Sequence, residues 1–274
     1  MSRYKAETYK FFSDIIFKQT GMVYGENDTY RLDSRIKELM TNFEFEDEKQ
    51  LVEAFKNRPS ADMMTILVNI STNNETYFFR DQKPFNALSD YMYLEVKKVN
   101  PGVINIWSAA CSTGQEPLSI LMSIQEKFGS SELRNIKLRA SDVSFKALSK
   151  AKSGTYTGLE VQRGLPINLL MKYFSHIEEE DRWQVDSNLL NQIDFRDHNL
   201  LTGSFENSKF HIIFCRNVLI YQNKDNKNII MNKLHDALKP GGFLVLGNGE
   251  SLIGMDSLLQ KDTNSAMTLY RRIK

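Results

Sequence analysis

The chain has few cysteines, few prolines and almost no net charge. Its 274 residues include two cysteines and six prolines, and the cysteines do not form a CxxC pair. This pattern excludes a disulfide framework and fits a reducing compartment. The 35 lysines and arginines almost balance the 34 aspartates and glutamates. Because proteins that bind nucleic-acid phosphates usually carry a clear basic excess, this balance disfavours a nucleic-acid partner.

Long apolar runs are also absent. No segment approaches the roughly 20 apolar residues that span a bilayer, and the polar first ten residues lack the apolar centre of a signal peptide. We therefore expect a cytoplasmic protein that does not insert into a membrane. Hydrophobic residues make up 41% of the chain, which is enough for the core of one large domain, or of a medium and a small one.

Residues 1–88 are expected to form a helical domain. Apolar residues recur there at helical spacing in four segments, and no strong strand pattern interrupts them. Thr20-Gly21 is a typical helix end. The apolar positions of the four segments include Phe12 and Ile16, then Leu32 and Ile36, then Leu51 and Phe55, and finally Ile66 and Ile70.

Residues 89–274 alternate between strand and helix patterns, which predicts an α/β domain with a doubly wound parallel sheet. Apolar runs at 103–107, 210–214 and 243–246 are typical of buried parallel strands. One segment, about 174–197, breaks the alternation: it is acidic, and it has strand-like pieces at 183–185 and 193–195. We expect it to form a small antiparallel insertion.

Ligands of open α/β sheets bind at the carboxyl ends of the strands, so the first strand–loop–helix is the first candidate site. Its loop, residues 110–114, has small side chains and ends in Gly114, which would let the backbone approach a ligand before a helix N-terminus. The loop matches a G-x-G-x-x-G fingerprint poorly, so a simple tight turn is an equal interpretation.

Two acidic residues near this loop have alternative interpretations. Asp142 ends the second strand and could accept both ribose hydroxyls of a nucleoside-type cofactor. It could also be the N-cap of the helix that starts near Ser144. Glu116 lies in the first turn of the preceding helix, where it could contact a ligand or complement the helix dipole.

Two further segments carry candidate polar residues: one follows a later strand, and the other precedes the α/β domain. Arg216 and Asn217 come directly after an apolar run, at a strand end where a reacting group would lie. Asn217 could instead support a turn, and Tyr221 could pack with its hydroxyl exposed. The segment 74–81 places two phenylalanines beside Arg80, which is also typical of interface packing and a surface ion pair.

Seven motifs occur together in a fixed order: N-x-T-x-F-F-R (74–80), W-S-A-A-C-S-T-G-Q-E-P-x-S-I (107–120), A-S-D (140–142), A-K-S-G-x-Y (151–156), N-L-L (199–201), F-C-R-N-V-x-I-Y (214–221) and L-K-P-G-G-x-L (238–244). The set closely resembles the CheR family of bacterial chemotaxis methyltransferases, which methylate glutamates on chemoreceptors. The resemblance covers nearly the whole chain, including an R-x-x-x-R-I-x-x-L pattern at 31–39 in the helical region.

The resemblance implies a Rossmann-like methyltransferase sheet that uses S-adenosylmethionine and releases S-adenosylhomocysteine. It implies a protein-glutamate O-methyltransferase in chemotaxis adaptation, whose partner is the cytoplasmic domain of methyl-accepting chemoreceptors. Asp142 would hold the ribose and Asn199-Leu200 would flank the adenine. Arg80 and Tyr221 would lie near the transferred methyl group as catalytic residues. The full set implied for cofactor contact is Asn74, Thr76, Arg80, Glu116, Asp142, Asn199, Leu200, Asn217 and Val218.

The chain departs from the family's pattern at two places that bear on the receptor. The family's basic receptor-facing helix corresponds here to residues that include Arg31 and Arg35, which we assign to substrate binding, but Asp33 and Glu38 dilute its charge. The insertion also lacks the glycine-containing loop of members that bind a tethering peptide at the receptor C-terminus. Both departures concern the receptor partner and leave the chemistry unchanged.

Two other functions are weighed against this one. A nucleic-acid methyltransferase would carry a (D/N/S)-P-P-(Y/F) site or a Pro-Cys nucleophile, and the sequence has neither. A methyltransferase-like binding module that has lost activity is disfavoured by Arg80, Asp142, Asn217 and Tyr221, although the sequence alone leaves it open. We assign no metal site and expect a monomer.

Overall fold

The computed structural model describes residues 3–25, 28–252, 259–265 and 267–273. Four helices make up its N-terminal part, and their apolar faces meet in a core of their own that includes Phe12, Ile36 and Leu51. These helices are α1 (Ala6–Thr20), α2 (Thr29–Asn42), α3 (Glu48–Lys56) and α4 (Ala61–Ser71). No helix in the described part of the chain has both the length and the apolar character needed to cross a bilayer.

Local sequence signals explain where these helices start and stop. Gly21 follows α1 with a left-handed backbone (φ 73°), as the predicted helix end at Thr20-Gly21 requires. The side chains of Asp47 and Ser60 cap α3 and α4 by accepting hydrogen bonds from backbone N–H groups of the first turn.

A linker leads from α4 to α5 (Lys83–Ala87), which continues through η2 (Leu88–Met92) into α6 (Tyr93–Val99). Phe85, Leu88 and Met92 from this stretch pack into the core of the α/β part. The domain boundary expected between residues 88 and 89 remains a prediction; it falls inside this helical stretch.

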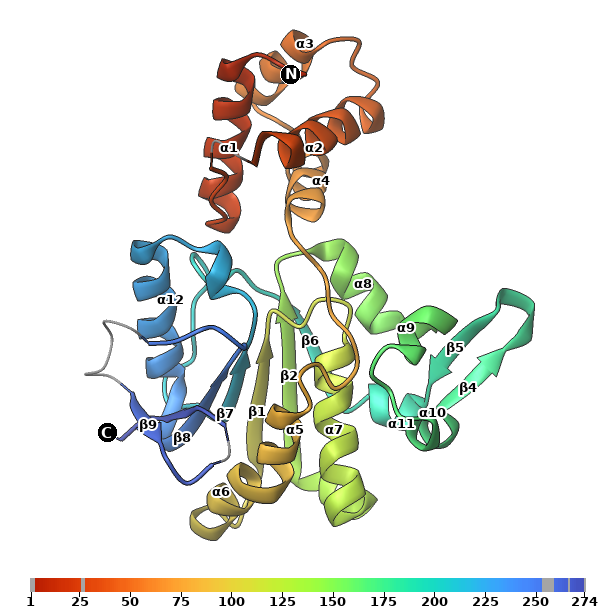
Figure 1. Ribbon diagram of the computed structural model, residues 1–274, viewed down its shortest axis with the longest axis vertical. Helices are drawn as coiled ribbons and strands as arrows, with labels where there is room; N and C mark the ends of the chain where they lie inside the picture. The colour runs from red at the N-terminus through yellow and green to blue at the C-terminus, as the bar shows by residue number, and fades with distance from the viewer. Residues whose placement is uncertain (1–2, 26–27, 253–258, 266, 274) are drawn as a thin grey trace.

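The central sheet has seven strands in the order β6-β2-β1-β7-β8-β10-β9. Neighbouring strands from β6 to β8 run parallel, whereas β10 is antiparallel to β8 and to β9. Helices flank the sheet, and the helical N-terminal part lies beyond one end of the strands (Figure 1). The predicted α/β fold with a doubly wound sheet is confirmed. The strands are β1 (Ile104–Ala109), β2 (Ile136–Asp142), β6 (Ile193–Asp197), β7 (Phe210–Cys215), β8 (Leu238–Leu246), β9 (Gln260–Asp262) and β10 (Leu269–Arg271); the longer helices of this part are α7 (Gln115–Phe128), α8 (Phe145–Ser153) and α12 (Lys224–Ala237).

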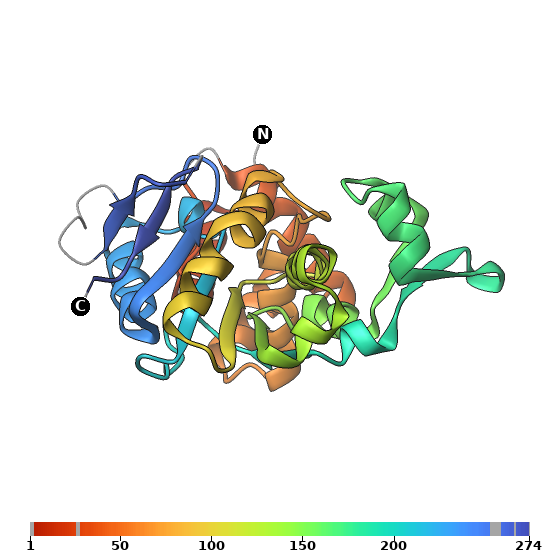
Figure 2. The same cartoon turned by 90° about the horizontal axis from the view of Figure 1, so that it is seen from below.

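A small antiparallel sheet projects from the side of the α/β part, away from β8 and β9 (Figure 2). Its strands are β3 (Thr155–Thr157), β5 (Arg182–Val185) and β4 (Phe174–Ile177), with β5 in the middle. The assignment of 193–195 to this insertion was wrong, because these residues belong to β6 and pair in parallel with β2. Period-two alternation predicts a strand but does not say which sheet it joins. Ile193 is buried in the main core and the partly buried Phe195 packs against it, which favours the larger sheet.

Candidate active site

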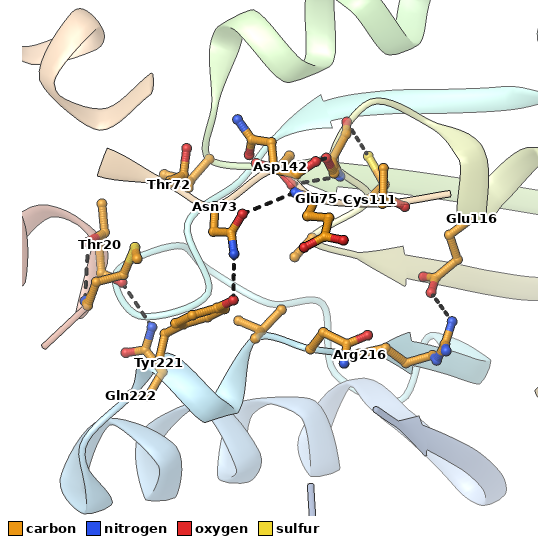
Figure 3. Close-up of a pocket in the computed structure, with 18 of the residues that line it drawn as sticks. Thr20, Thr72, Asn73, Glu75, Cys111, Glu116, Asp142, Arg216, Tyr221 and Gln222 are labelled. Atoms are coloured by element: carbon orange, nitrogen blue, oxygen red, sulfur yellow. Dashed lines mark hydrogen bonds and ion pairs between the residues drawn. The ribbon is translucent and has the colours of Figure 1, made fainter. Parts of the chain in front are cut away.

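The site lies where the carboxyl ends of β1, β2 and β7 meet, at the point where the strand order reverses (Figure 3). The cavity there is lined by the loop after β1, the end of β2, the turn after β7 and the linker after α4. The structure brings together there most of the residues predicted from the family's pattern: Asn74, Thr76, Arg80, Glu116, Asp142, Asn217, Val218 and Tyr221.

Asp142 is held in place by backbone N–H groups. One carboxylate oxygen accepts from Ser112 N at 2.8 Å and the other from Ser144 N at 2.9 Å. Burial raises the pKa of Asp142, and these N–H donors act in the opposite direction. The N-cap of α8 is Ser144, whose own hydroxyl accepts from Ala147 N, so the interpretation of Asp142 as that cap was wrong. Because a carboxylate has about four acceptor positions, both oxygens keep capacity for a ligand.

Glu116 belongs to a buried ion network across the cavity wall. One of its carboxylate oxygens accepts from the Ser108 hydroxyl at 2.7 Å, and the other lies 3.0 Å from an Arg216 guanidinium nitrogen. Arg216 also pairs with Asp81 at 2.6 Å and donates to the Arg80 carbonyl at 2.8 Å. Its side chain is only 2% exposed. The sequence marked Arg216 only as a polar residue at a strand end, and it lines the cavity too.

The turn after β7 carries Asn217, Val218 and, in the short helix η5 (Leu219–Tyr221), Tyr221. Asn217 adopts a left-handed backbone (φ 60°), which asparagine tolerates better than most residues. The carboxylate of Glu250, in the loop after β8, accepts hydrogen bonds from five backbone N–H groups: Asn217, Val218, Leu219, Ile220 and Gly247, at 2.7–3.3 Å. Sequence reasoning missed Glu250, because no local pattern connects it with a turn about 30 residues earlier.

Removing the Glu250 carboxylate should loosen this turn. We expect Glu250→Ala to lower the free energy of unfolding by about 2 kcal/mol, because several partly buried N–H groups lose their acceptor. We also expect it to lower the activity of the site, since the turn carries three cavity residues. Urea denaturation and a turnover assay measure the two effects. Glu179→Ala, which removes an exposed carboxylate in the small-sheet region, is the matched control and should change neither.

The backbone of the linker after α4 is hydrogen-bonded to the loop after β1 and to α7. The Ser112 hydroxyl donates to the Asn74 carbonyl at 2.7 Å, and Phe79 N donates to the Ser119 hydroxyl at 3.0 Å. The Arg80 guanidinium donates to the Glu75 carbonyl at 2.8 Å, which turns its side chain back over the linker. The segment 74–80 therefore combines interface packing, the alternative interpretation of this stretch, with residues that line the cavity.

The N-terminal helices contribute to the site, which the sequence did not predict. Thr20, the last residue of α1, and Met22 line the cavity together with Gln222. Gln222 donates to the Thr20 carbonyl at 3.2 Å, and Met22 and Gln222 form an isolated antiparallel bridge. Gly21 has φ 73°, and a Cβ there would lie 2.2 Å from Gln222 Oε1, so a larger residue would strain the backbone and displace the Gln222 side chain. The only sequence signal was the helix end at Thr20-Gly21.

Asn199 and Leu200 line a smaller adjoining cavity that shares Asp142 and Val218 with the main one. The Asn199 side chain donates to the Gln19 carbonyl at 2.7 Å, and its oxygen accepts from Leu201 N at 2.8 Å. Asn199 thus joins the end of α1 to the sheet at the place where the family's pattern puts the adenine.

Arg31 and Arg35 lie on α2, and neither lines the cavity. Their guanidinium groups lie 5.1 and 5.7 Å from the centre of the Tyr24 ring, and Arg31 pairs with Asp28 at 3.3 Å. The Arg35 guanidinium donates to the Arg31 carbonyl at 2.8 Å. These arginines are separate from the residues that surround the cavity.

The two cysteines are buried thiols. Cys111 lines the cavity, and burial, together with the charges of Asp142 and Glu116, raises its pKa. Burial likewise raises the pKa of Cys215. A thiolate nucleophile is therefore disfavoured at both positions.

The lining of the cavity fits S-adenosylmethionine. A carboxylate with free acceptor capacity at Asp142 suits ribose hydroxyls, and the apolar side chains of Val143 and Val218 suit the faces of an adenine ring. Acidic side chains nearby, Glu75 and Glu116, complement a cationic ligand.

Comparisons with known proteins agree with this geometry. The family model described as "CheR methyltransferase, SAM binding domain" matches residues 74–267. The chain is 37% identical to chemotaxis protein methyltransferase Cher2 of Pseudomonas putida over 268 residues, which cover 96% of this chain and 97% of that protein. It is 36% identical to chemotaxis protein methyltransferase 1 of Pseudomonas aeruginosa, with 96% and 97% covered. Chemotaxis protein methyltransferase of Escherichia coli is 29% identical, with 96% and 89% covered.

Proposed function

The chain belongs to the CheR methyltransferase family and uses S-adenosylmethionine, and from this premise we propose that it methylates glutamate carboxylates on chemoreceptors. The product would be a protein-glutamate methyl ester, formed in the cytoplasm on the cytoplasmic domain of a methyl-accepting receptor. We propose that the enzyme acts as a monomer, with Arg31 and Arg35 of α2 contacting the receptor.

One observation carries the proposed acceptor: every carboxylate in the cavity lining already has a protein partner. Asp142 accepts from Ser112 and Ser144, and Glu116 is bound to Ser108 and Arg216. Glu75 pairs with Arg163 at 2.6 Å, and this hydrogen bond and the arginine's charge lower the pKa of Glu75. No histidine lines this cavity in the described part of the chain. A site with no free base favours an acceptor that arrives deprotonated.

A glutamate side chain is such an acceptor. Its usual pKa is about 4.3, so it is ionised at neutral pH and needs no general base. When bound, S-adenosylmethionine supplies a methyl group on a positively charged sulfur. The transfer neutralises both charges, so a cavity that excludes water lowers the barrier.

The chain's main contribution is then to orient the carboxylate. Arg80 and Tyr221 both line the cavity, and each can donate a hydrogen bond to a carboxylate oxygen. A very tight grip would stabilise the charged carboxylate more than the less charged transition state. We therefore assign the two residues to positioning, which can contribute several kcal/mol without any proton transfer.

The proposal is tested by mapping the modified residue. Purified enzyme, S-adenosylmethionine and receptor-rich membranes are incubated, and receptor peptides are sequenced by mass spectrometry. We expect the mass of one added CH₂ on glutamate side chains. Methyl groups on lysine, arginine or a nucleobase would overturn the assignment of the acceptor, and the absence of any methylated product would favour an inactive binding module.

Tyr221→Phe should separate positioning from cofactor binding. It removes the hydroxyl and keeps the ring, so we expect methyl transfer to fall by about tenfold while the affinity for S-adenosylmethionine stays within about twofold. Turnover and calorimetry measure the two quantities. Tyr91→Phe, whose hydroxyl donates to Asp262 away from the cavity, is the matched control. Equal losses of turnover and affinity in Tyr221→Phe would count against a positioning role.

A further inference from the structure

Tyr221 meets an unassigned side chain at the edge of the cavity. Asn73 Nδ2 lies 2.7 Å from the Tyr221 hydroxyl oxygen, and both residues line the cavity (Figure 3). Asn73 precedes the first motif of the family's pattern, and neither the motifs nor the implied roles include it. Its place in the linker opposite η5 makes it the side chain that faces the Tyr221 hydroxyl.

The direction of this hydrogen bond is fixed by a second contact. Asn73 Oδ1 accepts from the backbone N–H of Glu75 at 3.3 Å, so the amide nitrogen is the end that faces Tyr221 (Figure 3). An amide nitrogen can only donate. The phenolic oxygen is therefore the acceptor in this pair, and its own hydrogen is not used on Asn73.

The rest of Tyr221 is held by its backbone. Its N–H donates to the Val218 carbonyl at 3.2 Å, and its carbonyl accepts from Val23 N at 3.2 Å. Its ring also packs against the core of the N-terminal helices. Asn73 therefore acts on the hydroxyl and is not the main support of the ring. An N–H donated into the phenolic oxygen also polarises the O–H bond and makes it a better donor.

From these contacts we propose that Asn73 is a positioning residue that makes Tyr221 a hydrogen-bond donor to the carboxylate receiving the methyl group. This inference rests on the proposed function for the identity of that acceptor. By accepting from Asn73, the Tyr221 hydroxyl keeps its hydrogen for the cavity, where the incoming carboxylate offers only acceptors.

The sharpest test reverses the hydrogen bond without changing the shape of the side chain. In Asn73→Asp the new carboxylate can only accept, so the Tyr221 hydroxyl donates to it and is lost to the substrate. We expect methyl transfer to fall by about tenfold, as in Tyr221→Phe. In Asn73→Ala the hydroxyl is left unpaired and can still donate, so we expect a smaller loss of about twofold. S-adenosylmethionine affinity, measured by calorimetry, should stay unchanged in both.

A double variant separates this role from simple charge repulsion. Adding Asn73→Asp to Tyr221→Phe should lower the rate of methyl transfer little further, because no hydroxyl remains to donate to the new carboxylate. A loss in that background as large as in the wild-type chain would overturn the proposal. A loss in Asn73→Ala that equals or exceeds the loss in Asn73→Asp would also overturn it, since that order indicates a purely structural residue.

A readout without any acceptor keeps this test distinct from that of the proposed function. The Asn73 side-chain amide resonance, assigned by its disappearance in Asn73→Asp, should shift in Tyr221→Phe and stay in place in Tyr91→Phe. No shift in Tyr221→Phe means that the hydrogen bond does not form, and the proposal fails whatever the substrate is. If the Asn73 amide resonance shifts in Tyr221→Phe but the enzyme makes no glutamate ester, the proposed function is wrong. The hydrogen bond between Asn73 and Tyr221 then exists, but its partner in the reaction is not a carboxylate.

Discussion

Asp142→Ala should weaken the binding of S-adenosylmethionine by about a hundredfold. A hydrogen bond to a charged group contributes about 1.5–3 kcal/mol, and the variant removes the carboxylate that we propose accepts two ribose hydroxyls. Two such bonds amount to about 3 kcal/mol or more, and every 1.4 kcal/mol is a factor of about ten in affinity. Isothermal titration calorimetry measures the change directly.

The same substitution also strips Ser112 N and Ser144 N of their acceptor, so a second variant is needed. Asp142→Asn keeps one side-chain oxygen and should fold while still losing about tenfold in affinity. Asp197→Ala is the matched control, because Asp197 pairs with Asp142 in the sheet register and is exposed outside the cavity lining. Unchanged affinity in both Asp142 variants would reject the assignment of the ribose to this residue.

Arg216→Met should cause the largest loss of stability. The guanidinium joins Glu116 and Asp81 in a site where its own side chain is 2% exposed and that of Glu116 is 12% exposed. Removing one partner of a buried ion pair leaves an uncompensated charge, which costs about 3–5 kcal/mol. We expect the free energy of unfolding, measured in urea, to fall by about 4 kcal/mol.

Two further variants identify the cause of that loss. Adding Glu116→Gln to Arg216→Met removes the stranded charge and should recover about 2 kcal/mol. Lys127→Met breaks the exposed pair with Asp90, in which both side chains are more than half exposed, and should cost less than about 1 kcal/mol. A loss in Arg216→Met no larger than in Lys127→Met would show that the buried network contributes little.

The fold could be predicted from the sequence wherever a local pattern determines the local structure. Gly21 ends α1 and Ser144 begins α8 at the expected places, and the apolar runs became β1, β7 and β8. The small sheet was predicted less well: β5 was expected at 183–185, whereas no strand was expected at β3 (Thr155–Thr157) or β4 (Phe174–Ile177). Pairing between strands distant in the chain depends on tertiary packing, which a period-two pattern does not carry.

The residues of the site, too, were predicted only where a sequence motif contains them. Asp142, Arg80 and Tyr221 were located through motifs, and the structure brings them to one cavity. Glu250, Gln222 and Asn73 were missed, because their roles come from backbone groups and hydroxyls that are remote in sequence. Glu250 acts on N–H groups about 30 residues away, and Asn73 on a hydroxyl 148 residues away. Such contacts leave no spacing signal in the sequence.

The central claim is that a receptor carboxylate accepts the methyl group, and the chemistry of the product tests it most directly. Receptor methylated with radiolabelled S-adenosylmethionine is treated with mild alkali, and the volatile label is counted. Esters hydrolyse in alkali whereas N-methyl groups persist, so we predict that the label leaves as methanol, in amounts that fall with Tyr221→Phe. Label that remains on the protein after alkali would contradict it.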